Sequence, residues 1–471
     1  MNHKKRKFGL SCVILSFLLF MFPISSVFAN SEAIQPDPWA VTELVDAEAL
    51  NLLPPYYNQS LHKTISSEQT NYILLQISKK LESLGYEPKT PSQEIQTDGT
   101  RGGFITLLYD ELLRFDLPDQ IFSSNLSAEE YMVQNSIVLG DGSGSLALER
   151  SCTVQEGILI AQRFLTDFCR RSGNASEGLL WKAVNGDNVL YLLGTIHADR
   201  GNIYPYSQGL YDAIASADAA YFEVDFFDEE GLWEFQKLQH YSDGTTLKDH
   251  ISPELYEIVV DVLGGFGLTE AQTASYKPWA LANTFSSLSM EESDPGTATA
   301  PVAIDLYVYK KAIASGAKIG EVEGYVFQGE LMDSLSEEYQ EAYLAANLLS
   351  YLYSLENGEP SASVSAIDEM LQMWSNRDAD AFEAYSAKEE QMAQGDELSV
   401  LLFEKRDQNM IAFADGLLQQ GGAKKQILVV GAGHMIGETG IVNGLKKLGY
   451  KVELVPLESD EALNAETSDA A

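Results

Sequence analysis

The sequence predicts an α/β fold, with a mixed or mostly parallel sheet flanked by helices and preceded by a small, mostly helical domain. Two observations lead to this prediction. Residues 176–457 alternate strand-like apolar runs with helical segments, which is the pattern of βαβ units. Residues 30–175 contain short amphipathic helices separated by loops with proline and glycine. We expect these two domains to lie between an export segment, 1–29, and a tail, 458–471.

The composition limits the classes of function that this chain can have. The 471 residues include 31 Lys and Arg against 69 Asp and Glu, a formal net charge of −38. Nucleic acids and anionic lipid surfaces are bound through clustered cationic side chains, so neither is expected as a partner. Hydrophobic residues make up 45% of the chain, which excludes wholesale disorder. The acidity suits a protein that stays soluble in a salty or cell-surface setting.

The two ends of the chain differ from the rest. Residues 1–29 have the form of a secretory signal, with a basic start at Lys4–Lys7, an apolar stretch over Phe8–Phe22 and small residues up to Ala29. An uncleaved membrane anchor is the alternative, but the apolar run is shorter than the roughly 20 residues that span a bilayer. We therefore expect an exported protein, extracellular or associated with the cell wall, without membrane contact after cleavage. Residues 458–471 form a short acidic tail that is expected to be disordered.

Three segments of the N-terminal region share one pattern, a capping residue followed by an apolar helical stripe. The capping residues are Ser66, Thr100 and Thr153. With a Trp39-led helix ahead of them, these segments resemble the S-layer homology repeat, a family in which three repeats bind pyruvylated cell-wall polysaccharide. The resemblance implies cell-wall polysaccharide as a partner. An all-helical accessory domain without affinity for the wall is the alternative.

Two cysteines lie outside the export segment, Cys152 and Cys169. The residues between them have the apolar spacing of a helix, which would separate them by roughly 25 Å at 1.5 Å per residue. A disulfide joins Cα atoms less than about 7 Å apart. We therefore expect two unpaired, buried thiols and no cysteine-based metal site.

Two of the six histidines follow the same local pattern. His197 comes three residues after Gly194, and His434 comes three residues after Gly431; each glycine ends an apolar, strand-like run. Glycine allows a sharp turn after a strand, and sites in open α/β sheets form beyond the carboxyl ends of strands. Imidazole is a common metal ligand and a base near neutral pH. From spacing alone, one shared site and two separate structural histidines remain equally open.

Acidic residues occupy comparable places in two other strand-like runs. The run at 219–226 contains Glu223 and Asp225, and a second run, at 317–324, contains Glu321 and Glu323; the acids of each pair share one face of a strand. An unpaired buried carboxylate is costly. Glu223 is flanked by apolar residues and needs a partner, so we favour a functional role for it. For Glu323, a functional role and a solvated edge strand are equal alternatives.

A series of short motifs runs in a fixed order through the second domain. They are Leu180–Lys182, Tyr191–His197, Glu223–Asp225, Ala303–Asp305, Val322–Gly324 with Gln328, Arg406–Met410, Gly431–Gly437 and Gly440–Val442. In these motifs, residues 180–455 resemble the TraB/GumN family, which includes the Tiki proteases. The resemblance covers about 280 of the 471 residues.

The family resemblance implies an α/β core and, for its characterised proteases, divalent-metal-dependent cleavage of a peptide or protein substrate. Carried over to this sequence, it gives a set of candidate site residues. They are His197, Glu223, His434 and Glu323 as metal ligands, Glu223 and Arg406 as catalytic residues, and Asp305 for substrate binding.

The chemistry of these residue types agrees with that implication. Two imidazoles with one or two carboxylates suit Mn²⁺, Co²⁺, Fe²⁺ or Zn²⁺, and a bound water would have a lowered pKa. A remaining carboxylate would act as general base and Arg406 would stabilise the developing oxyanion. Neither an HExxH motif nor a Gly-x-Ser-x-Gly elbow occurs in the sequence. Which acid is the ligand and which is the base stays open.

Two other functions stay open at this point. The chain is then either a binding protein that captures a peptide or signal without cutting it, or a wall-attached structural protein whose N-terminal repeats carry the function. The helical segment 325–400 has no motif with assignable chemistry and is expected to cover the sheet or cap the cleft.

Overall fold

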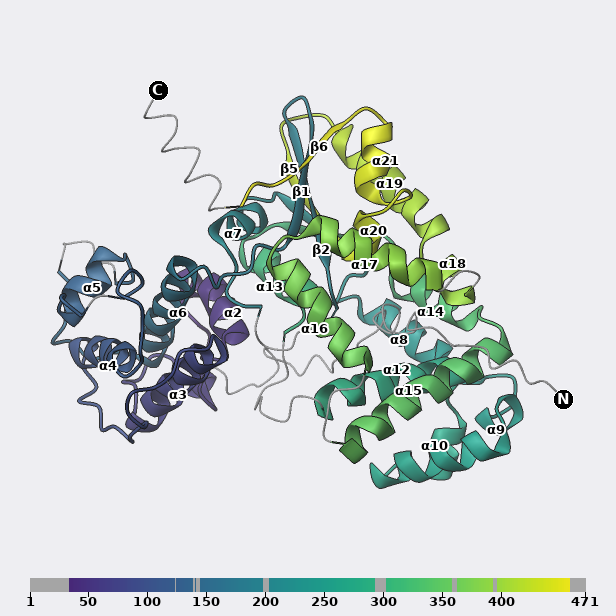
Figure 1. Cartoon of the computed structure of the whole chain (residues 1–471), viewed down its shortest axis with the longest axis horizontal. Coiled ribbons are helices and arrows are strands. Elements are labelled where there is room, and N and C mark those ends of the chain that lie inside the picture. Colours follow the sequence, from purple (N-terminus) through teal and green to yellow (C-terminus); the bar gives the residue numbers. More distant parts are fainter. Residues whose placement is uncertain are drawn as a thin grey trace. The chain divides into compact units, whose positions relative to one another are not determined.

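The computed structural model describes residues 34–122, 124–138, 140, 145–197, 203–292, 302–357, 362–392 and 396–457. The expected signal segment, 1–29, and the expected acidic tail, 458–471, lie outside these residues. The described chain divides into two compact units, whose elements are labelled in Figure 1. One unit is helical and the other contains the sheet.

The helical unit comprises residues 34–177 and 203–212 of the described chain. Its helices are η1 (Pro38–Ala40), α2 (Val41–Ala49), η2 (Tyr57–Gln59), α3 (Ser67–Ser83), α4 (Arg101–Leu113), α5 (Ala128–Gln134) and α6 (Val154–Arg171). The predicted caps are confirmed: the side-chain oxygens of Ser66, Thr100 and Thr153 each accept a hydrogen bond from the backbone N–H three residues later.

The two cysteines of the helical unit are unpaired and buried, as predicted. Cys169 lies near the end of α6, and Cys152 lies two residues before this helix begins. Burial raises the pKa of the Cys152 thiol to about 12 and that of Cys169 to about 11. Both side chains therefore stay protonated and act as small apolar groups of the core.

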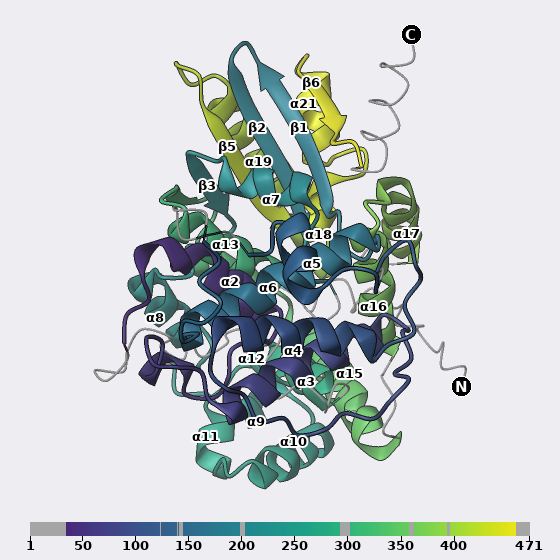
Figure 2. The same cartoon turned by 90° about the vertical axis from the view of Figure 1, so that its left-hand side faces the viewer.

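The second unit is built on one six-stranded sheet in the order β4-β3-β5-β2-β1-β6. The strands are β1 (Leu179–Asn185), β2 (Asn188–Thr195), β3 (Ala219–Phe222), β4 (Lys318–Glu321), β5 (Lys425–Gly431) and β6 (Lys451–Leu454). Strands β2, β5, β3 and β4 are parallel neighbours, while β1 is antiparallel to both β2 and β6. Figure 2 shows β1, β2 and β5 side by side. The predicted mixed, mostly parallel sheet is confirmed.

Helices flank this sheet, as predicted. From residue 208 onward the described helices are α7 (Gln208–Ala215), α8 (Glu229–Leu238), α9 (Leu247–His250), α10 (Pro253–Gly265), α11 (Glu270–Ala274), α12 (Pro278–Glu292), α13 (Ile304–Ala314), α14 (Tyr325–Asp333), α15 (Glu337–Asn357), α16 (Ala362–Ser375), α17 (Ala379–Met392), α18 (Glu397–Leu402), α19 (Glu404–Leu418), α20 (Ala432–Met435) and α21 (Ile441–Lys447). Of these, α13, α19, α20 and α21 contact the strands of the sheet. Helices α19 and α21 lie together beside the sheet (Figure 1). The expected helical character of 325–400 is confirmed by α14 to α17.

A hydrophobic core lies among the helices of the sheet unit. Trp279 of α12, Phe235 of α8 and Tyr343 of α15 are almost completely buried in it. The rings of Phe235 and Trp279 pack with their centroids 5.7 Å apart. Among the helices that the structure describes, none is both long enough and apolar enough to cross a membrane.

The two acidic strands are shorter than predicted. The runs expected to continue to residues 226 and 324 end at Phe222 and Glu321. Beyond these points the carbonyl oxygen of Glu223 accepts hydrogen bonds from the backbone N–H groups of both Glu323, at 3.1 Å, and Gly324, at 2.9 Å. Gly324 has a φ of 90°, a conformation that glycine adopts readily. Both segments bend directly after their strands. Glu223 and Glu323 therefore lie at the edge of the sheet rather than on its face.

Candidate active site

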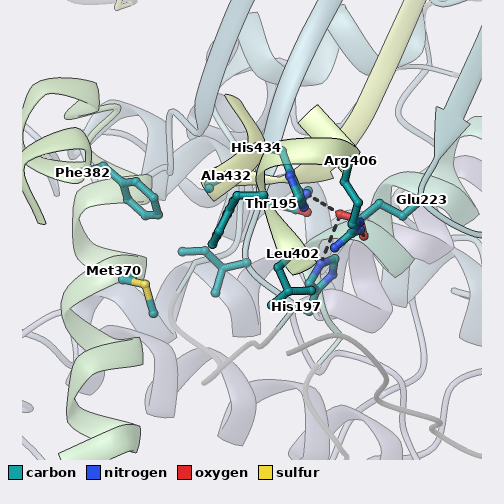
Figure 3. A pocket seen from close by; sticks show the side chains of 13 residues that line it. Thr195, His197, Glu223, Met370, Phe382, Leu402, Arg406, Ala432 and His434 are labelled. Atoms are coloured by element: carbon teal, nitrogen blue, oxygen red, sulfur yellow. Dashed lines mark hydrogen bonds and ion pairs between the residues drawn. The ribbon is translucent and has the colours of Figure 1, made fainter. Parts of the chain in front are cut away.

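The sheet topology brings the two Gly-x-x-His segments to one edge. Strands β2 and β5 are parallel neighbours, and Thr195, the last residue of β2, pairs with Gly431, the last residue of β5. His197 comes two residues after β2, and His434 lies in the short helix α20 that directly follows β5. Both imidazoles line the same pocket, which also includes Glu223 (Figure 3).

Glu223 lies between these groups, and its two carboxylate oxygens face different partners. Oε1 accepts a hydrogen bond from the backbone N–H of Gly431 at 2.7 Å and lies 3.6 Å from Nε2 of His197. Oε2 accepts hydrogen bonds from Nη2 of Arg406 at 2.8 Å and from Nε2 of Gln328 at 3.0 Å. The buried carboxylate thus has the partners that its burial requires.

Each of the two histidines is held by a carboxylate at its Nδ1 atom. Nδ1 of His197 lies 2.8 Å from Oδ2 of Asp305, and Nδ1 of His434 lies 2.7 Å from Oδ1 of Asp407. Oδ2 of Asp407 also accepts a hydrogen bond from the hydroxyl of Thr439 at 2.9 Å. Because a carboxylate only accepts hydrogen bonds, Nδ1 is the donor in both rings. In a neutral ring, Nε2 then carries the free lone pair.

Arg406 of α19 joins Glu223 to Glu323. Its Nε donates to Oε1 of Glu323 at 2.7 Å and its Nη2 donates to Oε2 of the same residue, also at 2.7 Å. The arginine is 1% exposed. A buried guanidinium is stable only when carboxylates compensate its charge, and the two glutamates do so here.

Charges of opposite sign alternate through the site. Burial by itself would lower the pKa of His197, but Asp305 and Glu223 on its two sides outweigh burial and raise the pKa to about 10. Burial also opposes ionisation of Glu223, but His197 and Arg406 hold the pKa of that carboxyl well below its ordinary value. Each charged group is therefore stabilised by its neighbours.

Gly431 leaves a small space at the point where these side chains meet. A Cβ atom at this position would lie 3.4 Å from Oε1 of Glu223, 3.6 Å from Nε2 of His197 and 3.6 Å from Cδ2 of His434. Only hydrogen occupies that position in glycine, so the three side chains surround a space about as large as one atom.

The donor set fits a divalent metal ion in its chemistry. Within the described ranges, no three His, Cys, Asp or Glu side chains are grouped closely enough to hold an ion as they stand. However, the 3.6 Å between Nε2 of His197 and Oε1 of Glu223 is close to the ~3.4 Å between two tetrahedral ligands that are each ~2.1 Å from an ion. Imidazoles held through Nδ1 by carboxylates are also the usual surroundings of bound metals. His434 lines the same pocket.

The structure brings most of the sequence-predicted residues together. Four of the six line the pocket, and these are His197, Glu223, Arg406 and His434. The other two make contact with these four: Asp305 bonds to His197, and Glu323 bonds to Arg406. The roles assigned to all six from the sequence stay predictions.

Some residues of the site were not identified from the sequence. Asp407 directly follows Arg406 in the motif Arg406–Met410. Its place in that motif is the signal that could have identified it. Gln328 was also quoted, without a role. Met370 and Phe382, which line the other side of the pocket, lie in helices without any motif.

Comparisons with known proteins concern the family of this chain rather than the geometry of its site. A family model described as the TraB/PrgY/gumN family matches residues 179–454. A curated relative, the metalloprotease TIKI1 of Danio rerio, is 23% identical over 337 residues, which are 61% of this chain and 65% of the relative. The chain therefore spans about 65% of the length of that relative. No solved structure shows significant similarity to the chain. The resemblance of the N-terminal helices to the S-layer homology repeat gains no support from these comparisons.

Proposed function

This chain belongs to the TraB/PrgY/gumN family, and from that premise we propose that it is a metal-dependent peptidase whose site contains His197, His434 and Glu223. The observation that carries the proposal is that these three side chains surround the space beside Gly431. The similarity to a protein named as a metalloprotease supports a peptide or protein as substrate. The signal-like composition of residues 1–29 supports export.

The proposed ligands are Nε2 of His197, which would release its proton to solvent when an ion binds, Nε2 of His434 and Oε1 of Glu223. Nitrogen and oxygen donors of this kind suit Mn²⁺, Co²⁺, Fe²⁺ or Zn²⁺. Such an ion, when bound, lowers the pKa of a water and polarises a peptide carbonyl.

The other charged residues position these three ligands. Asp305 and Asp407 fix Nδ1 of the two histidines as donors and so aim each Nε2 into the pocket. Arg406 holds Oε2 of Glu223, which keeps Oε1 directed toward His197 and Gly431.

Three roles predicted from the sequence change in this proposal. Both oxygens of Glu323 bond to Arg406, so we propose that Glu323 neutralises the arginine rather than binding the ion. Likewise, Nε and Nη2 of Arg406 bond to the two glutamates, so we propose that the arginine positions Glu223 rather than contacting a substrate oxyanion. Asp305 becomes the carboxylate that orients His197 rather than a group that binds substrate.

One observation favours a second candidate function, the capture of a peptide without hydrolysis. Both oxygens of Glu223 already accept hydrogen bonds from Gly431, Arg406 and Gln328. A carboxylate that is committed in this way serves a binding protein equally well, since it would keep the histidines in place for hydrogen bonding to a ligand.

Cleavage of a peptide pool separates the two functions. Residues 30–471 are freed of metal with a chelator and incubated with quenched fluorescent peptides and each of the four ions. We expect cleavage with at least one ion and a loss of at least 100-fold in His434→Ala. His62→Ala is the matched control, because His62 is an exposed histidine of the helical unit, and it should cleave like the wild type. Cleavage that survives in His434→Ala contradicts the proposal, and peptides that bind but stay intact with every ion support capture.

A further inference from the structure

The pocket has an apolar side opposite its charged side. Met370 of α16 and Phe382 of α17 lie away from Glu223 and Arg406 in Figure 3. Together with three other apolar side chains that line the same pocket, they form what we call the apolar recess. It consists of Ile196, Met370, Phe382, Leu402 and Phe403.

The recess is shielded from water. Ile196 is 5% exposed, Met370 3%, Phe382 4% and Leu402 3%. These side chains offer no hydrogen-bonding group, so a charged group that entered would lose its hydration without compensation. An apolar group would gain ~25 cal/mol for each Å² of surface removed from water. The recess therefore selects an uncharged, apolar occupant.

The size of the pocket narrows the choice further. Its volume is about 70 Å³, whereas a cavity that holds benzene measures about 150 Å³. The recess is only one part of this pocket, so it is too small for an aromatic ring, and a compact aliphatic side chain suits it better.

The walls of the recess are fixed relative to the charged groups. The indole Nε1 of Trp374, in the same helix as Met370, donates a hydrogen bond to the backbone carbonyl of Gly194 at 2.7 Å. Gly194 begins the segment that ends in His197, so this contact joins α16 to the strand end that presents the imidazole. Because Trp374 is fully buried, its contact with Gly194 fixes the position of α16 relative to His197.

We propose that the apolar recess binds a small aliphatic side chain of the substrate, on the residue that adjoins the bond to be cleaved. The inference deepens the proposed function and rests on it. It names the substrate class as peptides with alanine, valine, leucine or isoleucine beside the cleaved bond. It also gives α16 and α17, which carry no sequence motif, a role in specificity.

The test uses a peptide library and three small probes on the same protein. Products of a randomised library cut by metal-loaded residues 30–471 are identified by mass spectrometry. Binding of N-acetyl-leucinamide, N-acetyl-phenylalaninamide and N-acetyl-aspartamide is measured in parallel by saturation-transfer NMR. The variants are Phe382→Ala and Met370→Ala. Phe104→Ala is the matched control, because Phe104 is a fully buried phenylalanine of the helical unit.

We expect the wild type to prefer leucine over phenylalanine and aspartate at least tenfold in both measurements. Phe382→Ala enlarges the recess and should reduce the preference for leucine over phenylalanine at least tenfold. Met370→Ala should also reduce the preference for leucine over phenylalanine. Its result is the one that counts if Phe382→Ala does not fold. Phe104→Ala should keep the wild-type preference.

The outcomes separate this inference from the proposed function. The proposed role of the recess is overturned if the preference for leucine stays unchanged in both recess variants. It is also overturned if N-acetyl-aspartamide binds as well as N-acetyl-leucinamide. Cleavage without any aliphatic preference overturns the recess and leaves the peptidase standing. Probes that bind with the expected preference while no peptide is cut support the recess and overturn the peptidase.

Discussion

At the scale of single residues, each carboxylate of the site is held in its direction by hydrogen-bond donors. Asp305 and Asp407 each accept from Nδ1 of a histidine, and Glu323 accepts from Arg406. Only Oε1 of Glu223 is directed toward Nε2 of a histidine. The acids therefore divide into three that position other groups and one that presents an oxygen to the space beside Gly431.

Asp407 allows a direct test of this division. Asp407→Asn keeps the shape of the side chain but removes its charge, so Nδ1 of His434 is held less firmly. We expect the affinity for the preferred metal ion to fall ten- to a hundredfold, as is usual when such a partner is lost, as measured by calorimetric titration of chelator-treated protein. Asp380→Asn, in an exposed position of α17, is the control and should bind like the wild type. An unchanged affinity in Asp407→Asn would show that this acid has only a structural role.

At the scale of elements, the site depends on two strands that end side by side. The strand ends and the following glycines and histidines are predictable from the sequence, because apolar runs and turn residues are local signals. That β2 and β5 are neighbours is a long-range property, since more than 200 residues separate them in the chain. Local patterns therefore left a shared site and two separate histidines equally open, and the parallel pairing of Thr195 with Gly431 places both histidines at one pocket.

The predictions were least complete where a side chain depends on distant partners. Asp407 contacts His434, 27 residues further along the chain, and Met370 and Phe382 line the pocket from helices with ordinary amphipathic patterns. The acidic strands were predicted too long, because the period of two continues past the point where the backbone of Glu223 turns away from the sheet.

The contact between helix α19 and the ends of β3 and β4 predicts a large effect on stability. Arg406→Met removes the cation between Glu223 and Glu323 and leaves two buried carboxylates uncompensated. We expect the free energy of unfolding of metal-free protein to fall by about 3–5 kcal/mol, as measured by urea denaturation. The double variant Arg406→Met/Glu323→Gln removes one of these charges and should recover part of the loss. A loss below about 1 kcal/mol would mean that the arginine is not essential to the packing of this edge.

At the scale of the whole molecule, the dominant feature is the net charge of −38. A field of this sign attracts cationic ligands and repels anionic ones, and dissolved salt weakens both effects. We therefore expect the charge to affect how fast a substrate arrives, whereas we propose that the apolar recess and the charged groups of the pocket determine what is bound.

The charge predicts a salt dependence that distinguishes two peptides. A peptide with added lysines should associate with the protein about tenfold more slowly in 0.5 M than in 0.05 M NaCl, because screening removes the long-range attraction. A neutral peptide with the same aliphatic residue should change little. Stopped-flow fluorescence measures both rates, and an equal response of the two peptides would show that the net charge does not guide association.

The central claim is that His197, His434 and Glu223 hold a metal ion beside Gly431, and thermal stabilisation tests it most directly. Melting temperatures of residues 30–471 are measured with and without Mn²⁺, Co²⁺, Fe²⁺ and Zn²⁺, for the wild type, His434→Ala and Gly431→Ala. In Gly431→Ala the new Cβ makes ordinary contacts with the protein but would fill the space that we propose for the ion. Gly416→Ala, where a Cβ meets nothing within 4 Å, is the control.

The account predicts that at least one ion raises the melting temperature of the wild type and of Gly416→Ala. At 100 times the Kd this corresponds to a stabilisation of about 2.7 kcal/mol. The increase should be absent in His434→Ala and Gly431→Ala, while Gly431→Ala melts near the wild-type temperature without metal. If no ion stabilises the wild type, or if Gly431→Ala is stabilised as much as the wild type, the proposed metal site is wrong.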